Sequence, residues 1–542
     1  MVTIAVNKDK LLKRLRLEEY ELDYILFNLG SETRVIDNNE VEIEINANRL
    51  DLLHSSGIKR AVDGLLERQI GIANYDIYES DYTLVVKSVR ARPYALAAVV
   101  NGLNLDLEDL KELIQFQEKL HDTIGRKRRK VAIGLHDLKK IDNNVIVYRE
   151  AGLEEKFVPL YGKERMSIKE ILSSTEQGKM YGSISLYDST MPVIAEENGE
   201  ILSMPPVINS DKTRIELTTK DLFIDVTGTS LTQVAQTLDV LVSNLAEMGA
   251  KIGIVKIKAD YAEKSPLFLT SEIKVSYDYL NERLGLRLRK EDLVKQILKS
   301  RLGASFDSKE ESLKVIVSPY RPDIFREIDI VEEIAMSLGY GNIPLLQYNP
   351  KGIGKLSWKT EISRKIRDLS IGAGFQEILS FILTSEDLAL DKNYAKITNP
   401  ISELYNIVRN SLIPQLLLFL SKNQHARFPI KIFEVGEVSI KDTSSDTGFS
   451  NSLRVAYGLM DSKVSYENLQ APLHQILTNL GLEVTYRKLN SEIFIKGRAA
   501  EIFVKDQNIG VIGEVGPDLL LTKFNITYPV VIAEIYLDKL KK

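Results

Sequence analysis

The sequence contains no cysteine, and this absence removes several classes of protein. Without a thiol there is no disulfide scaffold, no thiolate zinc site, no iron–sulfur cluster and no catalytic cysteine. The five histidines are scattered along the chain, and none stands at the spacing of metal ligands. The chemistry of this protein must therefore be sought in other side chains.

Long apolar runs and several common motifs are also missing. No apolar stretch reaches the ~18 residues that a membrane-spanning helix needs, and the first residues carry no signal-peptide core. The sequence has no P-loop, no glycine-rich dinucleotide fingerprint and no nucleophile elbow. From these absences we expect a soluble, cytoplasmic protein with no membrane partner.

Positive charge is not in excess. The chain has 71 Lys and Arg residues against 76 Asp and Glu residues, so its formal net charge is −5. This balance excludes binding of nucleic acid by bulk positive charge, but it leaves room for a local basic patch. At about 100–200 residues per domain, the length corresponds to about three to five domains.

Helical and strand periodicities predict a multidomain α+β protein. Strict alternation over residues 41–45 predicts a strand with one buried face, and glycines such as Gly285 and Gly339 stand where helices would end. We divide the chain into an α/β module (1–80), an α+β domain (81–265), a small helical domain with a short sheet (266–346) and a largely antiparallel sheet with helices (347–542). Expected strands are 2–6, 41–45, 84–86, 97–100, 130–135, 273–276, 313–317, 381–383, 431–438, 453–459, 500–504, 508–515 and 530–535; expected helices are 22–29, 56–66, 110–125, 230–249, 277–284, 291–302 and 329–338; residues 178–220 are expected to be rich in turns, and 347–354 to form a linker.

Four carboxylates gather in one short stretch. Asp329, Glu332 and Glu333 stand at i, i+3 and i+4, which places them on one face of a helix near its first turn. Asp323 lies six residues upstream, after a proline that keeps the chain extended. Hard oxygen ligands of this kind suit Mg²⁺. Acidic residues at a helix N-terminus also simply favour the helix dipole, and the spacing alone favours this second interpretation.

Two further clusters could carry function. The five consecutive cations at 126–130 could contact phosphates, although such a run is also typical of a solvated loop. Residues 204–210 and 221–229 combine a proline pair, small polar residues and Asp225 among apolar neighbours, so they could line a pocket. A turn followed by a helix cap at Thr229 explains the same residues, and each cluster taken alone favours the simpler interpretation.

Taken together and in this order, the motifs resemble the β subunit of phenylalanyl-tRNA synthetase in its shorter archaeal and eukaryotic form. The resemblance covers essentially the whole chain. Its segments are 48–53 (NRLDLL), 92–95 (RPYA), 131–137 (VAIGLHD), 321–324 (RPDI), 329–343 (DIVEEIAMSLGYGNI), 374–381 (GFQEILSF), 399–400 (NP), 408–414 (VRNSLIP) and 432–437 (IFEVGE).

The resemblance implies a fold and a set of partners. It identifies 1–80 as an N-terminal module, 81–265 as a B3/B4 tRNA-editing domain, 266–346 as a winged-helix-like B5 domain and 347–542 as a class II synthetase-like domain. It implies an α subunit in an α2β2 tetramer, tRNA(Phe) as a further partner, and ATP as a substrate of the assembled enzyme. It also implies that Asp323, Asp329, Glu332 and Glu333 hold Mg²⁺ near the α subunit, which favours the metal interpretation.

The C-terminal domain departs from a working class II site. The arginine expected on the second-motif strand is replaced by Ile440 or a neighbour, and residues 510–517 lack the final arginine of the third motif. Without these cations the developing charge of an adenylate has no stabiliser. We therefore interpret this domain as a pseudo-catalytic scaffold, with no catalytic residue for aminoacylation, and expect activation of phenylalanine on the α subunit.

The resemblance also implies hydrolysis of mischarged tyrosyl-tRNA(Phe). A hydrophobic pocket rejects an added hydroxyl by only about 10²-fold, so a second, hydrolytic site is useful. Asp225 matches the family's acidic residue for the phenol. The expected neighbours are Thr227, Asn209, Ser210, Gln117 and Arg128, with His121 and His136 as weaker candidates. Two alternatives remain open: a stand-alone trans-editing deacylase, and a non-catalytic scaffold for tRNA and the α subunit.

Overall fold

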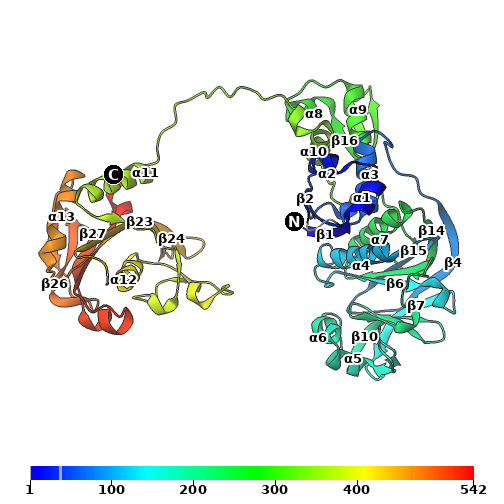
Figure 1. Ribbon diagram of the computed structural model, residues 1–542, viewed down its shortest axis with the longest axis horizontal. Coiled ribbons are helices and arrows are strands. Elements are labelled where there is room, and N and C mark those ends of the chain that lie inside the picture. Colours follow the sequence, from blue (N-terminus) through cyan, green and yellow to red (C-terminus); the bar gives the residue numbers. More distant parts are fainter. Residues whose placement is uncertain (1, 36–38, 542) are drawn as a thin grey trace. The chain divides into compact units, whose positions relative to one another are not determined.

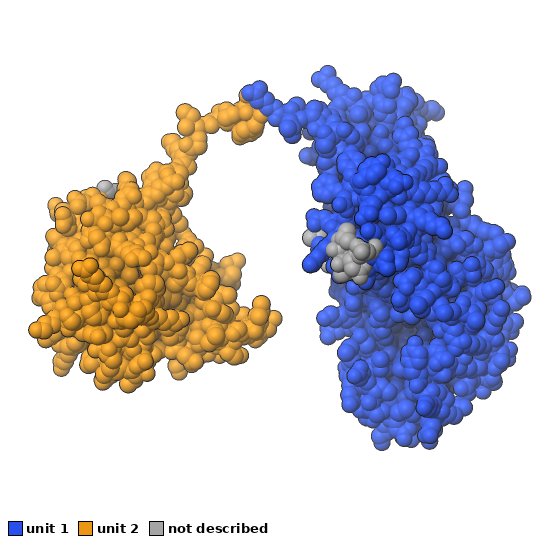
Figure 2. Space-filling model, in the orientation of Figure 1, with its two compact units in different colours: residues 1–347 blue, residues 348–542 orange. Residues whose placement is uncertain are grey.

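The chain folds into two compact units, residues 1–347 and 348–542 (Figure 2). The structure is a computed structural model that describes residues 2–35 and 39–541. Over these residues, none of the helices has the length and the apolar composition needed to cross a membrane. We describe each unit by itself.

The first unit begins with a small antiparallel sheet in the order β1-β3-β2 (Figure 1). The predicted alternation at 41–45 is confirmed, because Val41, Ile43 and Ile45 are all buried. We did not predict α1 or β2: half of the residues of α1 are cationic, and the helix buries only Leu11 and Leu15. The elements are β1 (Val2–Asn7), α1 (Lys8–Leu15), α2 (Glu19–Asn28), β2 (Glu32–Val35), β3 (Glu40–Ile45) and α3 (Ser55–Leu65).

A larger sheet of ten strands, counted over the described residues, follows in the order β12-β11-β10-β7-β4-β14-β5-β13-β6, with β15 paired to β14. Helix α7 packs against β5 and β13, and α4 packs against β6 (Figure 1). All seven residues of β13 are buried. The elements are β4 (Ile77–Val86), β5 (Tyr94–Asn101), α4 (Leu107–Asp122), β6 (Val131–Asp137), β7 (Val145–Gly152), β10 (Thr190–Glu196), β11 (Ile201–Met204), β12 (Ile208–Asn209), β13 (Leu222–Gly228), α7 (Leu231–Ala246), β14 (Lys251–Ala259) and β15 (Ala262–Ser265).

The stretch at 178–220, expected to be rich in turns, also contains regular strands. Strands β10 and β11 lie there, and apart from the half-buried Thr190 that opens β10 every residue of both strands is buried. A strand buried on both faces shows no alternation, so its sequence does not display the usual pattern. Side chains of both strands belong to a separate small hydrophobic core. Its other elements are β8 (Lys156–Phe157), β9 (Met166–Ser167), α5 (Ile168–Ser174) and α6 (Glu176–Tyr181).

The third part of the first unit is a three-stranded sheet, β16-β18-β17, covered by three helices around their own core. The predicted ends of two helices are confirmed: Gly285 caps α8 in the left-handed conformation, with φ of 67°, and Gly339 follows α10. The elements are β16 (Ser271–Ser276), α8 (Tyr277–Leu284), α9 (Lys290–Lys299), β17 (Gly303–Asp307), β18 (Ser312–Val317) and α10 (Glu327–Leu338).

The second unit is built on a seven-stranded sheet in the order β19-β23-β24-β28-β27-β26-β25. As predicted, it is largely antiparallel; the exception over the described residues is the pair β19–β23. Side chains of α11 and α13 share one core with the sheet, and those of α12 share a second. The large elements are α11 (Trp358–Gly372), β19 (Gln376–Glu377), α12 (Ile413–Lys422), β23 (Ile430–Lys441), β24 (Phe449–Met460), α13 (Tyr466–Asn479), β25 (Val484–Lys488), β26 (Phe494–Val504), β27 (Gln507–Val515) and β28 (Val530–Tyr536).

The predicted strand at 381–383 is mostly wrong. Only Leu383 of these residues lies in a strand, β20 (Leu383–Thr384), which pairs with β22 (Ile407–Val408) beside β21 (Ala395–Lys396). Phe381 is 75% exposed. Three consecutive apolar residues indicated a buried strand, but they lie on the surface.

Close packing of α3 generates a first prediction. A Cβ on Gly64 would overlap the backbone carbonyl oxygen of Lys299, at the end of α9. Because neither backbone can move freely, Gly64→Ala should destabilise the first unit by about 1–3 kcal/mol, despite the higher helix propensity of alanine. Calorimetry of the full chain would show a lower first transition. Gly152→Ala is the control, since a Cβ there meets open space, and an equal effect of both substitutions would contradict this packing.

Candidate functional site

The four predicted carboxylates lie around one small cavity of about 50 Å³. The cavity lies between α10, the end of α2 and the segment 46–49 that follows β3. Its lining residues are Leu29, Asn46, Asn48, Arg49, Asp323, Ile324, Asp329, Glu332, Glu333 and Met336. The fold therefore brings all four carboxylates of the sequence motif to one place.

Two of these carboxylates are bound by Arg321. Its Nε and Nη2 donate to the two oxygens of Asp323 at 3.0 and 2.8 Å, and its Nη1 donates to Glu333 Oε2 at 3.1 Å. Arg321 Nη2 also contacts Glu333 Oε1. Burial alone would raise the pKa of Glu333, but the charge and hydrogen bonds of Arg321 outweigh it and lower that pKa. Both carboxylates are thus neutralised from within the domain.

Asp329 has the role that the helix-dipole interpretation assigned to it. Its Oδ2 accepts the backbone N–H groups of Phe325 and Arg326 at 2.7 and 2.9 Å, at the start of α10. Glu332 is exposed. Among the described residues there is no group of three or more His, Asp or Glu side chains arranged to hold a metal ion. The four residues do not fit a magnesium cage as they stand, so the Mg²⁺ site remains a prediction.

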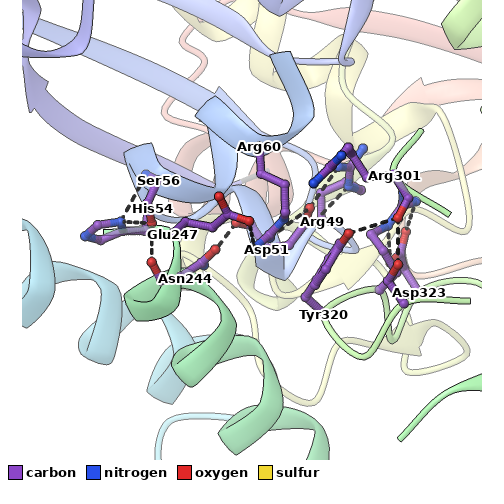
Figure 3. A network of polar contacts seen from close by, with 12 residues as sticks. Arg49, Asp51, His54, Ser56, Arg60, Asn244, Glu247, Arg301, Tyr320 and Asp323 are labelled. Atoms are coloured by element: carbon purple, nitrogen blue, oxygen red, sulfur yellow. Dashed lines mark hydrogen bonds and ion pairs between the residues drawn. The ribbon is translucent and has the colours of Figure 1, made fainter. Parts of the chain in front are cut away.

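A buried polar network runs from this cluster into the rest of the first unit (Figure 3). Arg49 donates to both oxygens of Asp51 at 2.9 Å. The guanidinium of Arg60 lies 3.6 Å from the ring centre of Tyr320, whose hydroxyl donates to the Arg301 carbonyl at 2.9 Å. These contacts join the first module to the segment that precedes α10.

The same network reaches α7. Asn244 Nδ2 donates to the Asp51 carbonyl at 3.1 Å, and Ser56 Oγ donates to the Asn244 carbonyl at 2.8 Å (Figure 3). The sequence motif at 48–53 is therefore part of a structural junction. Sequence reasoning did not find this role, because nothing in the motif reveals that Arg60 is fully buried.

The predicted editing residues Asp225 and Thr227 lie on β13, and both are buried. Asp225 stands opposite Gly134 on β6 and Ala97 on β5. A Cβ at position 134 would overlap Asp225 Oδ1. The small residues on the neighbouring strands therefore leave the space that this carboxylate occupies.

Asp225 is joined to His136, which the sequence named only as a weaker candidate. His136 Nε2 lies 2.8 Å from Asp225 Oδ1, and His136 Nδ1 lies 2.7 Å from Thr213 Oγ1. An ionised Asp225 accepts from Nε2–H, which leaves Nδ1 to accept from the threonine hydroxyl. Within the described part of the chain, Asp225 Oδ2 is buried without a hydrogen-bond partner. This oxygen can accept a hydrogen bond from a ligand.

Three other candidates cover the outer edge of β6, the last strand of the sheet. Gln117 Nε2 donates to the Ile133 carbonyl at 2.8 Å, and His121 Nε2 accepts the Ile133 N–H at 2.8 Å. Asn209 Nδ2 donates to the Leu135 carbonyl at 3.3 Å. Side chains thus satisfy the backbone groups that an edge strand leaves unpaired. These contacts give the three residues a structural role.

Arg128 and Ser210 are also held by the domain itself. Arg128 Nη2 donates to the two oxygens of Glu118 at 2.7 and 2.9 Å, and Nη1 donates to the Pro206 carbonyl at 3.1 Å. Burial would raise the pKa of Glu118, but hydrogen bonds from His121 and Arg128 lower it to about 2. Ser210 Oγ donates to the Val158 carbonyl at 3.2 Å.

Sequence reasoning missed Arg92 as a site residue. Its Nη2 donates to the Thr227 carbonyl at 2.8 Å, and its Nη1 donates to the Arg128 carbonyl at 3.1 Å. Arg92 is buried, and burial lowers its pKa. It ties the basic loop to β13. The motif at 92–95 was a usable signal, but it did not show where the guanidinium points.

In the second unit, buried ion pairs occupy the sheet face that α12 covers. Arg409 Nη1 donates to Glu434 Oε1 at 2.7 Å, and Arg454 Nη1 donates to Glu534 Oε2 at 2.6 Å. Glu534 Oε1 also accepts the Leu412 N–H at 2.6 Å. Both arginines are therefore bound to carboxylates of the sheet.

Comparison with known proteins finds similarity along the whole chain. Residues 119–249 match the family model described as "B3/4 domain", residues 273–340 match "tRNA synthetase B5 domain", and residues 346–537 match "Phenylalanyl tRNA synthetase beta chain CLM domain". The chain is 54% identical to the phenylalanine–tRNA ligase β subunit of Saccharolobus solfataricus, over 100% of this chain and 99% of the relative. It is 51% identical to that of Sulfurisphaera tokodaii, with the same coverage.

A solved structure is also similar. The crystal structure of an N-terminal fragment of the phenylalanyl-tRNA synthetase β subunit from Pyrococcus horikoshii aligns with a TM-score of 0.60 and 32% identity. The match covers 63% of this chain and 100% of the fragment.

The Arg321 cluster generates a second prediction. Glu333→Gln should destabilise the first unit by about 3–5 kcal/mol, because it breaks a buried charge pair. Since Arg321 lowers the pKa of Glu333, this stabilisation is present at neutral pH and is lost as the pH falls through the folded-state pKa. Thermal unfolding of parent and variant at several pH values would measure the difference.

Glu332→Gln is the control, since Glu332 is exposed, and it should change stability by less than about 0.5 kcal/mol. EDTA or added Mg²⁺ should not change the thermal unfolding of the parent, because Arg321 already pairs with Glu333. A thermal unfolding transition that depends on Mg²⁺ in the parent, and loses this dependence equally in both variants, would contradict the structural role of Glu333. It would favour a metal site.

Proposed function

The chain belongs to the family of phenylalanine–tRNA ligase β subunits, components of an aminoacyl-tRNA synthetase, and on that premise we propose how its two units divide the work. The companion α subunit activates phenylalanine with ATP and transfers it to tRNA(Phe). This chain supports that reaction and hydrolyses tyrosyl-tRNA(Phe). The assembled enzyme is an α2β2 tetramer.

The second unit serves as a scaffold. A synthetic site needs cations that are free to hold the phosphate of ATP and the developing adenylate charge. Arg409 and Arg454 are instead paired with Glu434 and Glu534. These internal pairs support the proposal that activation takes place on the α subunit.

Exposed apolar loops on the second unit support a protein partner there. Leu379, Phe381, Ile401 and Leu404 are all exposed, and the rings of Phe381 and Tyr405 lie 6.1 Å apart. Apolar side chains gathered at a surface are typical of interaction sites. This cluster is a suitable contact for the α subunit.

One observation carries the editing proposal: the unpartnered Oδ2 of buried Asp225. A buried acceptor without a donor is unfavourable by about 1–3 kcal/mol. The phenol of tyrosine can donate to this oxygen, whereas phenylalanine cannot. The pocket would therefore select the mischarged amino acid by the hydroxyl that the synthetic site fails to reject.

His136 and Thr213 hold the carboxylate in place for this selection. His136 occupies Oδ1 and is itself held by Thr213, so Oδ2 is the acceptor left for the substrate. In the reaction, water attacks the ester carbonyl, the bond to the terminal ribose oxygen breaks, and tyrosine and tRNA with a free hydroxyl are released. Pocket polar groups and the tRNA 3′ end position the water.

Asp225→Asn tests the selection of the phenol. The substitution keeps the shape of the side chain but removes its charge, so deacylation of tyrosyl-tRNA(Phe) should slow by about ten- to hundred-fold. Charging with phenylalanine by the assembled enzyme should not change. Asp260→Asn, in the exposed turn that follows β14 in the same domain, is the control. Equal deacylation by parent and Asp225→Asn would show that the site assignment is wrong.

Co-expression with the α subunit tests the division of labour. The complex should charge tRNA(Phe) with phenylalanine, and this chain alone should show no phenylalanine-dependent exchange of pyrophosphate into ATP. If no complex forms and the chain alone clears tyrosyl-tRNA, it is a trans-editing deacylase. A complex that charges tRNA but deacylates nothing would identify a non-catalytic scaffold.

A further inference from the structure

Helix α2 presents aromatic side chains to the surface of the first unit. Tyr20, Tyr24 and Phe27 stand at i, i+4 and i+7, which places them along one face of the helix, and they are 83%, 67% and 66% exposed. Leu22, Ile25 and Leu26 supply the opposite, buried face. The helix therefore has a complete core contact without the three aromatic residues. Exposed aromatic side chains gathered in this way are typical of an interaction site.

This face continues toward the B5 domain. Gly339, which follows α10, lies beside the end of α2: a Cβ there would stand 3.8 Å from Asn28 Oδ1. Leu29 and Met336 line one cavity. Figure 1 draws α2 and α10 beside each other. Tyr340 comes next in the chain and is 57% exposed. We call Tyr20, Tyr24, Phe27 and Tyr340 the aromatic surface.

Acidic residues lie beside the aromatic side chains of α2. Glu19, Glu21 and Asp23 lie on the helix, Glu18 precedes it, and the helix itself contains no Lys or Arg. Of these carboxylates, Glu19 is paired with Lys8 at 2.8 Å. Near Tyr340, the exposed Glu332 adds a further carboxylate. Negative charge of this density disfavours a phosphate backbone. It favours a protein partner with basic residues around an apolar contact.

We propose that the aromatic surface is a docking site for the α subunit, which would place basic side chains opposite α2. This inference rests on the proposed function, in which an α subunit is the companion of this chain. A second copy of the chain is a poorer occupant, because a two-fold contact through this face would set its acidic residues against one another. Tyrosine and phenylalanine in the centre of such a contact supply much of the binding energy.

The test uses the full chain with Tyr20→Ser, Tyr24→Ser and Phe27→Ser combined, and purified α subunit. Affinity measured by biolayer interferometry should fall at least about ten-fold relative to the parent, and the affinity of the parent should weaken as salt rises. The unfolding transition should not change, because the three side chains are exposed. A matched control combines Tyr161→Ser, Met180→Ser and Leu217→Ser, which are also exposed, and should bind as the parent does.

Four outcomes would overturn the inference. Unchanged affinity of the α2 variant, while the parent binds the α subunit and the complex charges tRNA, would reject the surface alone and leave the proposed function standing. Failure of the parent to bind the α subunit would reject both. Loss of tRNA affinity without loss of α-subunit affinity would indicate a nucleic-acid surface. Self-association of the parent that the variant abolishes would indicate a second copy of the chain.

Discussion

The first unit depends on the enclosure of charged side chains at the junction of its parts. Arg49, Asp51 and Arg60 are all buried, and a charge removed from water is tolerated only when it is paired and hydrogen-bonded. The partners come from distant segments, since Arg60 stacks on Tyr320 and Asn244 binds the Asp51 carbonyl. Satisfying these groups requires α3, α7 and the segment before α10 to meet in one arrangement.

The same requirement explains why carboxylates with similar sequence signals behave differently. Asp323 and Glu333 are satisfied by Arg321, so their oxygens already have donors. Asp225 is equally buried, but His136 engages only one of its oxygens. A fully paired carboxylate stabilises a domain, whereas one with a free oxygen can still recognise a donor. This difference is the physical basis for assigning structure to one cluster and ligand recognition to the other.

Both units expose apolar side chains on their surfaces. The second unit satisfies the charges of Arg409 and Arg454 on its sheet face with its own ion pairs. Its exposed loops around Phe381 and the exposed face of α2 in the first unit are both apolar. Exposed apolar side chains gathered in this way are typical of protein interaction sites.

The sequence by itself determined the elements whose signals are local. Alternation at 41–45 and the glycine at 285 act within a few residues, so the strand and the end of α8 were predictable. The family motifs likewise located Asp225 and the carboxylates of α10. The tertiary structure alone decided what those side chains contact: that Arg321 takes two of the carboxylates, that His136 holds Asp225, and that Gln117 and Asn209 cover an edge strand. It also decided that β10 is a buried strand and that Phe381 is exposed. The reason is that burial and pairing depend on segments far apart in the chain, whereas periodicity and capping depend on neighbours.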